Sequence, residues 1–212
     1  WDAQQNYWAG HEWNTANPWQ PVLNNQSNGN YAQNNSDARY YNDSYPGWEV
    51  SNPATQTPCK DLPNANEMSW YCKFGDPRWD ADELWTTMGH LYKGGMWFKK
   101  KSVLQAENHY DTEKSADNTT DLRTTEKVYY TSSSITTPGL PSASDANNYF
   151  YLPVLGFYWN GQLCNIGLYG SYWSSSAAPG HSNSAYKLSI GSGGVTVGGS
   201  DSYFGYRVGG FE

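Results

Sequence analysis

The chain has 212 residues, of which 17% are aromatic and 16% charged, and its formal net charge is -7 at pH 7. This length fits one large domain, and the acidic balance argues against a nucleic-acid partner, because binding that polymer depends mainly on Lys and Arg side chains that neutralise phosphates. No apolar run approaches the roughly 18 residues that a membrane-spanning helix needs, so we expect no direct membrane insertion. The chain starts at Trp1 without a signal-like stretch, and we expect it to be part of a longer protein.

The N-terminal part, residues 1–58, is dense in Asn, Gln, Ser, Pro and Trp. It lacks a periodic apolar pattern, as residues 13–19 and 24–35 illustrate. This composition predicts long ordered loops rather than helices or strands. We expect aromatic side chains to pin these loops to the rest of the domain.

Two short helices are predicted in the middle of the chain. Asn64 or Asn66 is a suitable N-cap for the first, which ends at the Gly-Asp-Pro sequence of residues 75–77. The second is predicted over residues 80–92, because acidic side chains at its start favour the helix dipole and apolar ones recur at helical spacing. Those apolar residues are Leu84, Trp85, Met88, Leu91 and Tyr92.

Strands are predicted from residue 96 onwards. Residues 96–98 indicate a buried strand, and residues 106–127 a polar, charged insertion that we expect to be exposed. Residues 149–155 and 172–176 are predicted to enter the core, and residues 206–208 to form a closing strand.

A hairpin is predicted where two alternating segments flank the glycine-rich residues 191–194. Tyr186, Leu188 and Ile190 lie on one face of the first segment, which is the period of a half-buried strand. Val195 and Val197 repeat this pattern in the second. The neighbouring residues are therefore expected to point outward, and they are Ser189, Gly191, Thr196 and Gly198.

Three cysteines, Cys59, Cys72 and Cys164, leave an odd one however they pair, and none has the C-x-x-C spacing of a zinc or redox site. A disulfide between Cys59 and Cys72 would close a small loop in an exported protein. Two reduced, buried cysteines are an equally good interpretation. Cys164 fits either a surface thiol or a small buried apolar residue.

Residues 157–211 combine many aromatic residues with Ser, Gly and Asn, and charge is scarce there. Antibody-like binding sites use this mixture, because Tyr and Trp supply contact area at low entropic cost while Ser, Gly and Asn supply adaptable hydrogen bonds. The composition therefore favours a recognition surface. The alternative is an ordinary aromatic-rich β core with Gly and Ser in its turns.

Several segments carry a resemblance to a known family. They are residues 152–156 (LPVLG), 170–176 (GSYWSSS), 185–188 (AYKL) and 205–208 (GYRV). Together they resemble a C-type-lectin-like family that includes the variable proteins of diversity-generating retroelements. Residues 62–68 and 85–91 are similar to segments of surface and pilus-associated adhesins of anaerobic gut bacteria.

The resemblance covers roughly residues 60–212 and implies an α+β, C-type lectin-like fold with two short helices, small antiparallel sheets and long ordered loops. It implies a single domain over residues 1–212, with a loop-rich part (1–58), a polar insertion (106–127) and a variable-region-like tail (152–212). An extracellular location, at the bacterial cell surface or pilus tip, goes with it.

In that family, template adenines are mutated during reverse transcription, so Asn codons yield Tyr, Ser, Gly, Asp and similar residues but not Lys, Gln or Trp. Lys187, Gln162, Trp159 and Trp173 are then fixed framework. The resemblance implies these variable, ligand-binding positions: Phe157, Tyr158, Leu163, Cys164, Leu168, Tyr169, Ser171, Gly180, His181, Ser184, Ser189, Gly191, Gly194, Thr196, Gly198, Gly199, Ser200, Asp201, Ser202, Tyr203, Phe204 and Tyr206.

Metal and catalytic chemistry has little support in the sequence. The calcium-binding motifs of calcium-dependent lectins are missing, and the His residues lack the spacing of a zinc site. Asp76, Asp80, Asp82 and Glu83 offer oxygen ligands or a carboxylate pair, although charge at a helix N-terminus is the preferred interpretation. We therefore expect no cofactor, no metal and no catalytic residue.

The sequence thus predicts a non-enzymatic adhesin domain that binds varied protein or glycan receptors on another cell or on a phage or host surface. Other pilus subunits are further possible partners. The aromatic residues expected to anchor the ligand are Tyr158, Tyr169, Tyr203, Phe204 and Tyr206. The alternatives are a glycan-processing enzyme that uses Asp80, Asp82 or Glu83, and a structural pilus or phage-fibre subunit.

Overall fold

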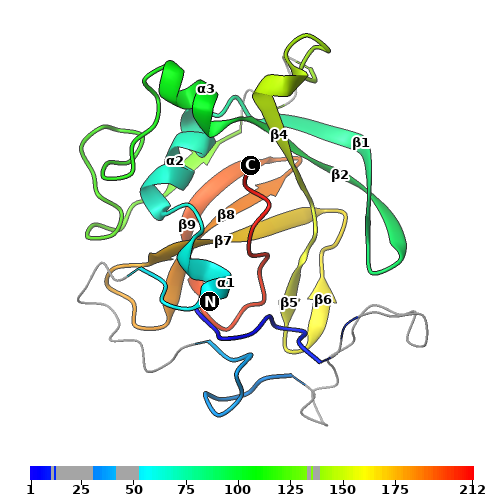
Figure 1. The fold of residues 1–212 in the computed structure, drawn as a ribbon, viewed down its shortest axis with the longest axis vertical. Helices are drawn as coiled ribbons and strands as arrows, with labels where there is room; N and C mark the ends of the chain where they lie inside the picture. The colour runs from blue at the N-terminus through cyan, green and yellow to red at the C-terminus, as the bar shows by residue number, and fades with distance from the viewer. Residues whose placement is uncertain (11, 13–30, 42–52, 133–134, 136–138) are drawn as a thin grey trace.

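The computed structural model describes residues 1–10, 12, 31–41, 53–132, 135 and 139–212 (Figure 1). The loops predicted over residues 13–30 and 42–52 lie outside the described residues. The helices are α1 (Thr57–Lys60), α2 (Ala65–Phe74) and α3 (Lys101–Ala106), with a 3-10 turn, η2, over Ala146–Asn148. The strands are β1 (Arg78–Thr87), β2 (His90–Lys99), β3 (Tyr129–Thr131), β4 (Tyr149–Pro153), β5 (Phe157–Trp159), β6 (Gln162–Cys164), β7 (Tyr169–Ala177), β8 (Ser184–Gly191) and β9 (Gly194–Asp201).

The described strands form small antiparallel sheets. One has the order β1-β2-β4, a second has the order β3-β9-β8-β7, and β5 pairs with β6 as a separate hairpin. Helix α2 lies over the four-stranded sheet, and the β5–β6 hairpin projects from the end opposite α3 (Figure 1). The described part of the fold is therefore mixed, with three short helices and antiparallel sheets, as the sequence predicts in outline.

Helix α2 begins where the sequence predicts. The Asn64 side chain accepts a hydrogen bond from the Glu67 backbone N–H, and the Glu67 carboxylate accepts one from the Asn64 backbone, which makes a complete capping box. The helix buries Met68, Tyr71 and Cys72 against the sheet. This packing, together with the cap, fixes α2 on the inner face of the sheet.

The helix predicted over residues 80–92 is wrong, because this segment is the β1–β2 hairpin. Asp80 stabilises a bulge instead of a helix end: its carboxylate accepts hydrogen bonds from the backbone N–H groups of Asp82 and Glu83 and from Trp97 Nε1, each 3.0 Å long. A carboxylate that accepts hydrogen bonds from nearby backbone N–H groups can stabilise a β-bulge as well as the first turn of a helix.

Two of the apolar residues of this segment pair across the hairpin. Trp85 lies opposite Tyr92, and their rings stack with centroids 5.1 Å apart. Met88 and Gly89 form the tip in left-handed backbone conformations, with φ of 49° and 74°. Spacings that fit a helix face therefore arise here from cross-strand pairing.

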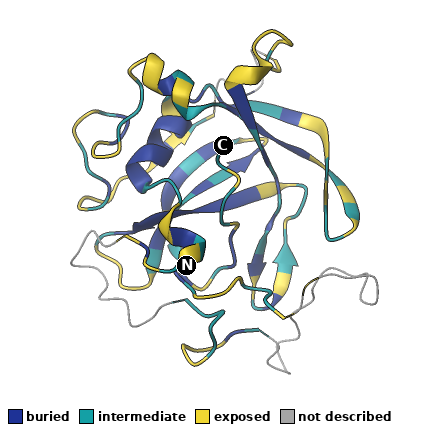
Figure 2. Cartoon of the chain, in the orientation of Figure 1, coloured by how far each residue is buried: buried dark blue, intermediate teal, exposed yellow. Residues whose placement is uncertain are grey.

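Most of the predicted strands in the tail are confirmed. Leu188, Ile190, Val195 and Val197 are all buried in the main core, as their alternation predicts. Figure 2 shows long buried stretches in the strands of the four-stranded sheet. The strand predicted at residues 96–98 is part of β2. Residues 206–208 do not form a full strand, since Arg207 makes only an isolated parallel bridge to Tyr172.

The polar insertion is more anchored than predicted. Leu122 and Ser115 are fully buried, and the Leu122 backbone N–H donates to Asn66 Oδ1 over 2.8 Å. Trp70 Nε1 donates to the Lys114 carbonyl over 2.8 Å. The insertion therefore wraps over α2, whose polar groups it satisfies.

The proposed Cys59–Cys72 disulfide is wrong, because all three cysteines are free. Cys72 lies in the main core beside β9, and burial raises the pKa of its thiol to about 11. Cys59 lies in a second cluster on the other side of the sheet, with Trp1 and Trp173. The alternative of two buried, reduced cysteines is the one the structure has.

Candidate functional site

Strand β7 divides the protein into two packing regions, because its neighbouring residues Tyr172 and Trp173 point to opposite faces of the sheet. Tyr172 belongs to the main core. Trp173 belongs to the second cluster, on the outer face, where its ring lies 4.4 Å from that of Tyr206. The outer face of the sheet is therefore partly covered by the C-terminal segment.

The outward positions predicted on β8 and β9 are confirmed in part. Ser189 and Thr196 lie opposite each other and are partly exposed. Gly191 and Gly198 are buried, because the Tyr169 ring covers the first and the Val128 side chain the second. A Cβ on Gly191 would lie 2.8 Å from the Tyr169 ring, so no side chain fits there unless that ring moves.

The β5–β6 hairpin and the loop over residues 202–206 carry a continuous aromatic group. Phe204 stacks on Tyr206 with centroids 5.4 Å apart and an interplanar angle of 6°, and the Phe157 ring meets both edge-on. Tyr203 and Trp159 flank Phe204 at 4.8 and 6.5 Å. The group extends from the second cluster to the surface, where Trp159 is 49% and Tyr203 41% exposed.

Backbone hydrogen bonds join these two segments. Tyr158 and Gly205 exchange both of their N–H···O bonds, each 2.9 Å long. A Cβ on Gly205 would lie 2.7 Å from both the Tyr158 Cβ and the Tyr7 ring, so glycine is required for this close approach. The aromatic side chains are thus held on a backbone with little freedom.

The N-terminal segment completes a groove beside this group. The aromatic groove, as we call it, has a volume of about 470 Å³ and is lined by Tyr7, Tyr31, Ala32, Gln33, Tyr40, Trp159, Asn160 and Tyr203. Among the described residues that line it, none is charged. Tyr7 is fixed there because its hydroxyl accepts a hydrogen bond from the Gly161 N–H over 2.9 Å.

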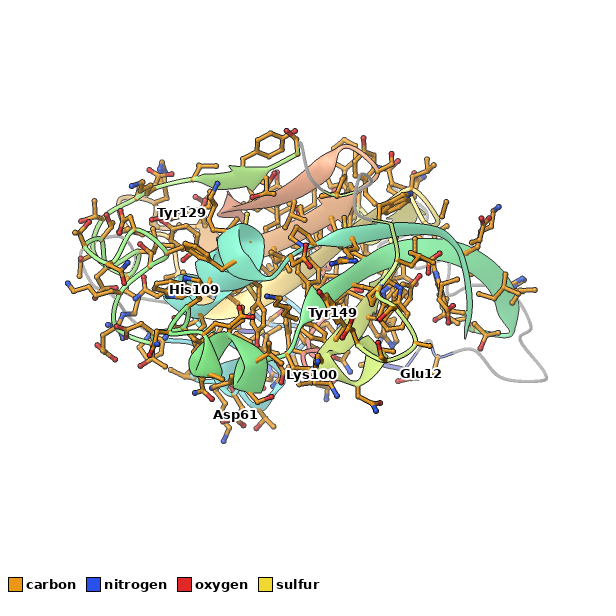
Figure 3. The ribbon with its side chains drawn as sticks, turned by 90° about the horizontal axis from the view of Figure 1, so that it is seen from above. Glu12, Asp61, Lys100, His109, Tyr129 and Tyr149 are labelled. Atoms are coloured by element: carbon orange, nitrogen blue, oxygen red, sulfur yellow. The ribbon has the colours of Figure 1, made fainter. Side chains whose placement is uncertain are left out.

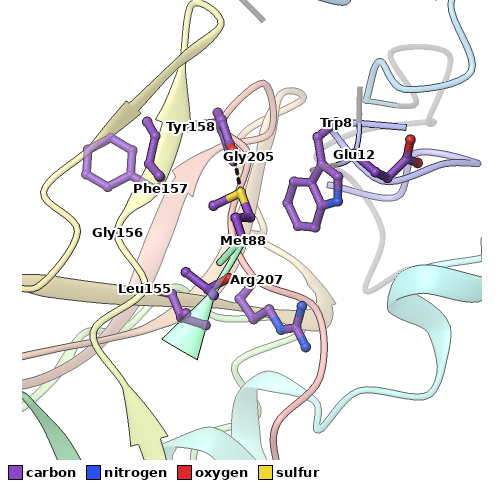
Figure 4. Close-up of a pocket in the computed structure, with 11 residues that line it drawn as sticks. Trp8, Glu12, Met88, Leu155, Gly156, Phe157, Tyr158, Gly205 and Arg207 are labelled. Atoms are coloured by element: carbon purple, nitrogen blue, oxygen red, sulfur yellow. Dashed lines mark hydrogen bonds between the residues drawn. The ribbon is translucent and has the colours of Figure 1, made fainter. Parts of the chain in front are cut away.

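A second hollow, the hairpin pocket, lies where the tip of the β1–β2 hairpin meets β5 (Figure 4). Its volume is about 350 Å³, and it is lined by Trp8, Glu12, Thr87, Met88, Leu155, Gly156, Phe157, Tyr158, Leu163, Gly205 and Arg207. The Tyr158 hydroxyl donates to Met88 Sδ over 3.8 Å. Burial raises the pKa of Tyr158, and the Trp8 ring packs against it with centroids 5.6 Å apart.

The positions predicted to be variable fall into three classes of exposure. Exposed are Leu168, Tyr169, Gly180, His181, Gly199 and Tyr203. Partly exposed are Phe157, Leu163, Cys164, Ser184, Ser189, Gly194, Thr196, Ser200, Asp201 and Phe204. Buried, contrary to the prediction, are Tyr158, Ser171, Gly191, Gly198, Ser202 and Tyr206.

The buried positions have structural roles. Tyr206 packs on Trp173, and its hydroxyl lies 2.8 Å from Ser200 Oγ, while Ser171 Oγ lies 3.2 Å from Ser189 Oγ. Of the five aromatic anchors that the sequence suggests, Tyr206 is therefore buried in the second cluster, and Tyr158 is buried but lines the hairpin pocket. Tyr203, Tyr169 and part of Phe204 remain accessible.

The sequence does not predict Tyr7, Tyr31 and Tyr40 as groove residues. Trp159 is predicted only as a fixed framework residue. The N-terminal tyrosines lie in a segment without periodic pattern, so nothing local indicates that they meet a hairpin roughly 120 to 150 positions later. The one available signal is the density of aromatic residues in a polar segment.

Three of the four acidic residues considered for catalysis have structural partners. Asp80 stabilises the bulge, Asp82 pairs with Lys93 at 3.0 Å, and Asp76 pairs with Arg78 at 2.7 Å. Within the described part of the chain, no three His, Cys, Asp or Glu side chains come together to hold a metal ion. His109 stacks on the Phe74 ring. In Figure 3 it lies on the opposite side of the molecule from Glu12, so these two titratable residues do not share a site.

Comparisons with models of protein families, with curated proteins and with solved structures find no match. None of the described helices is long and apolar enough to cross a membrane. The candidate function therefore depends on the aromatic groove, the hairpin pocket and the resemblance in the sequence.

Proposed function

We propose that this chain is a non-enzymatic ligand-binding domain with a C-type lectin-like fold. Its aromatic groove and the exposed residues of its C-terminal third contact a protein or glycan receptor. The observation that supports this proposal most strongly is the pair of exposed rings, Trp159 and Tyr203, at the edge of a groove whose described lining residues are all uncharged. Exposed aromatic residues gathered at one hollow are typical of binding surfaces rather than of ordinary surface.

The groove supplies both contact area and polar specificity. Trp159 and Tyr203 offer flat apolar faces, and the side-chain amides of Gln33 and Asn160 offer hydrogen bonds beside them. Phe204 packs between the second cluster and both exposed rings, so the anchors lose little conformational entropy when a ligand binds. Such preorganisation suits tight binding by a small surface.

The same surface fits diversification by retroelement mutagenesis. Exposed positions such as Leu168, Tyr169 and Tyr203 accept many side chains without disturbing either core. Trp159 lies among the residue types that adenine mutagenesis does not create, which makes it a constant anchor beside variable neighbours. A receptor-binding domain of this kind belongs outside the cell, at the bacterial surface or on a pilus.

The test replaces both exposed rings of the groove. We expect the double variant Trp159→Ala/Tyr203→Ala to bind its receptor about 30-fold more weakly or worse, since loss of one aromatic anchor costs about 2 kcal/mol. Binding is measured on a glycan array and against a panel of purified cell-surface proteins.

Tyr130→Ala is the matched control, because Tyr130 is also an exposed ring, 54% accessible, but lies on β3 outside the groove. Its binding should equal that of the parent chain. Equal binding by the parent chain, the control and the double variant would exclude the groove as the ligand-binding site.

A further inference from the structure

Arg207 differs from the other arginines of the chain. Arg39 pairs with Asp37 at 2.7 Å and Arg78 with Asp76 at 2.7 Å. Arg123 pairs with both Asp121 and Glu113. The guanidinium of Arg207, by contrast, forms no ion pair and no hydrogen bond with any residue that the structure describes. In a chain of net charge -7, an unused cation is available for a ligand.

Arg207 is also held in place. Its backbone N–H donates to the Ser171 carbonyl over 3.0 Å, and its carbonyl accepts from the Trp173 N–H over 2.9 Å. These two bonds fix the segment along β7 even though the side chain is exposed. The guanidinium is therefore presented at the hairpin pocket by a rigid backbone.

The pocket beside Arg207 is mainly apolar. Trp8, Met88 and Leu163 supply an indole, a thioether and an isobutyl group to its walls, and Figure 4 shows Trp8, Met88 and Arg207 converging on the same space. A volume of about 350 Å³ lies at the small end of the range of ligand sites. The site thus combines room for one apolar group with a cation at its edge.

We propose that the hairpin pocket binds the C-terminal residue of a peptide or protein ligand, with its apolar side chain among Trp8, Met88 and Leu163 and its carboxylate on Arg207. Guanidinium groups bind carboxylates through two parallel hydrogen bonds, so the Arg207 side chain is suited to hold the C-terminal carboxylate of such a ligand. Glu12 is the other charged residue of the lining.

A sugar fits the pocket less well. Its hydroxyl groups would need several partners, and the apolar walls leave them unpaired, which costs free energy for each buried polar group. The Tyr158 hydroxyl already donates to Met88 Sδ. The inference goes beyond the proposed function, because the hairpin pocket and the aromatic groove share no lining residue.

The probe is N-acetyl-tryptophan, and its matched neutral control is N-acetyl-tryptophanamide, which lacks only the charge. Titration calorimetry and ligand-observed NMR should detect the acid binding to the parent chain at least tenfold more tightly than the amide. Arg207→Gln should reduce acid binding to the level of the amide and leave amide binding unchanged. Arg207→Lys, which keeps the charge but not the paired geometry, should fall between the two.

Lys60→Gln controls for the change in net charge, since Lys60 is exposed on α1, and it should bind like the parent chain. Far-UV circular dichroism and thermal unfolding check that each variant folds. Equal affinity of the parent chain for acid and amide, no binding of either, or acid binding that survives Arg207→Gln would each overturn the inference.

The groove variant separates this inference from the proposed function. Trp159→Ala/Tyr203→Ala leaves the residues that line the hairpin pocket in place, so it should bind N-acetyl-tryptophan as the parent chain does. Loss of receptor binding in that variant with retained probe binding supports both proposals. Failure of the probe experiment alone removes the pocket assignment and leaves the groove.

Discussion

Replacing Trp173 by Ala should lower the free energy of unfolding by about 3–5 kcal/mol, the usual cost of removing a large aromatic side chain from a core. Trp173 is 2% exposed and belongs to the second cluster together with Trp1 and Tyr206, and its ring centroid lies 4.4 Å from that of Tyr206. The cavity left behind would also loosen the segment that carries Phe204. Chemical denaturation followed by circular dichroism measures the effect.

Trp159→Ala is the matched control for this prediction, because it makes the same chemical change at a ring that is 49% exposed. We expect it to change the free energy of unfolding by about 1 kcal/mol or less. If the two substitutions destabilise the protein equally, the division between buried and exposed aromatic residues described above is incorrect.

A second large effect on stability is expected at Lys187, where a substitution should stabilise the protein instead of destabilising it. Its ammonium lies on the outer face of the four-stranded sheet, donates to Ser189 Oγ, and sits 5.6 Å from the centroid of the Tyr206 ring. It forms no ion pair with a carboxylate of the described residues. Burial lowers the pKa of Lys187 from 10.5 to about 8, because the charged form is poorly solvated there.

The direction in which Lys187 changes the free energy of unfolding with pH follows from proton linkage. The unfolded chain binds the proton more tightly, so the cost of the buried charge is fully present below pH 8 and declines as the pH rises from about 8 towards 10.5. Lys187→Met should therefore raise the free energy of unfolding by about 1–3 kcal/mol at pH 7, a figure reduced for the partial exposure of the side chain. The gain should shrink above pH 8 and vanish above about 10.5.

Unfolding of parent and variant is compared at pH 7, 9 and 10.5. Lys60→Met is the control, since Lys60 is exposed on α1 and should show no such gain. A Lys187→Met chain that is less stable than the parent at pH 7, or a difference that does not depend on pH, would contradict the account of Lys187.

The parts of the fold that the sequence predicts correctly are those with local signals. The Asn64 cap is followed by a buried helix, and the alternation of residues 186–190 is followed by a glycine-rich turn, so both elements are encoded by their own residues. Residues 80–92 are different, because Trp85 and Tyr92 are seven positions apart. That spacing fits one face of a helix and equally a pair of residues that meet across a hairpin.

The sequence predicts only the C-terminal half of the proposed binding surface. Its exposed residues are concentrated in residues 157–204, where composition alone indicates recognition. Tertiary contacts decide the rest: Tyr206 is buried because Trp173 and Ser200 meet it, and Tyr7 joins the groove because it bonds to Gly161. No pattern within a single segment contains that information.

We propose that the exposed part of the C-terminal third is a diversified binding surface, and sequencing this gene from many independent isolates tests this most directly. We predict amino-acid changes at adenine-rich codons of exposed positions such as Leu168, Tyr169 and Tyr203, with Trp173 and Gly205 constant. A tail that is identical in all isolates, or one that varies as much at its buried positions as at its exposed ones, would contradict the claim.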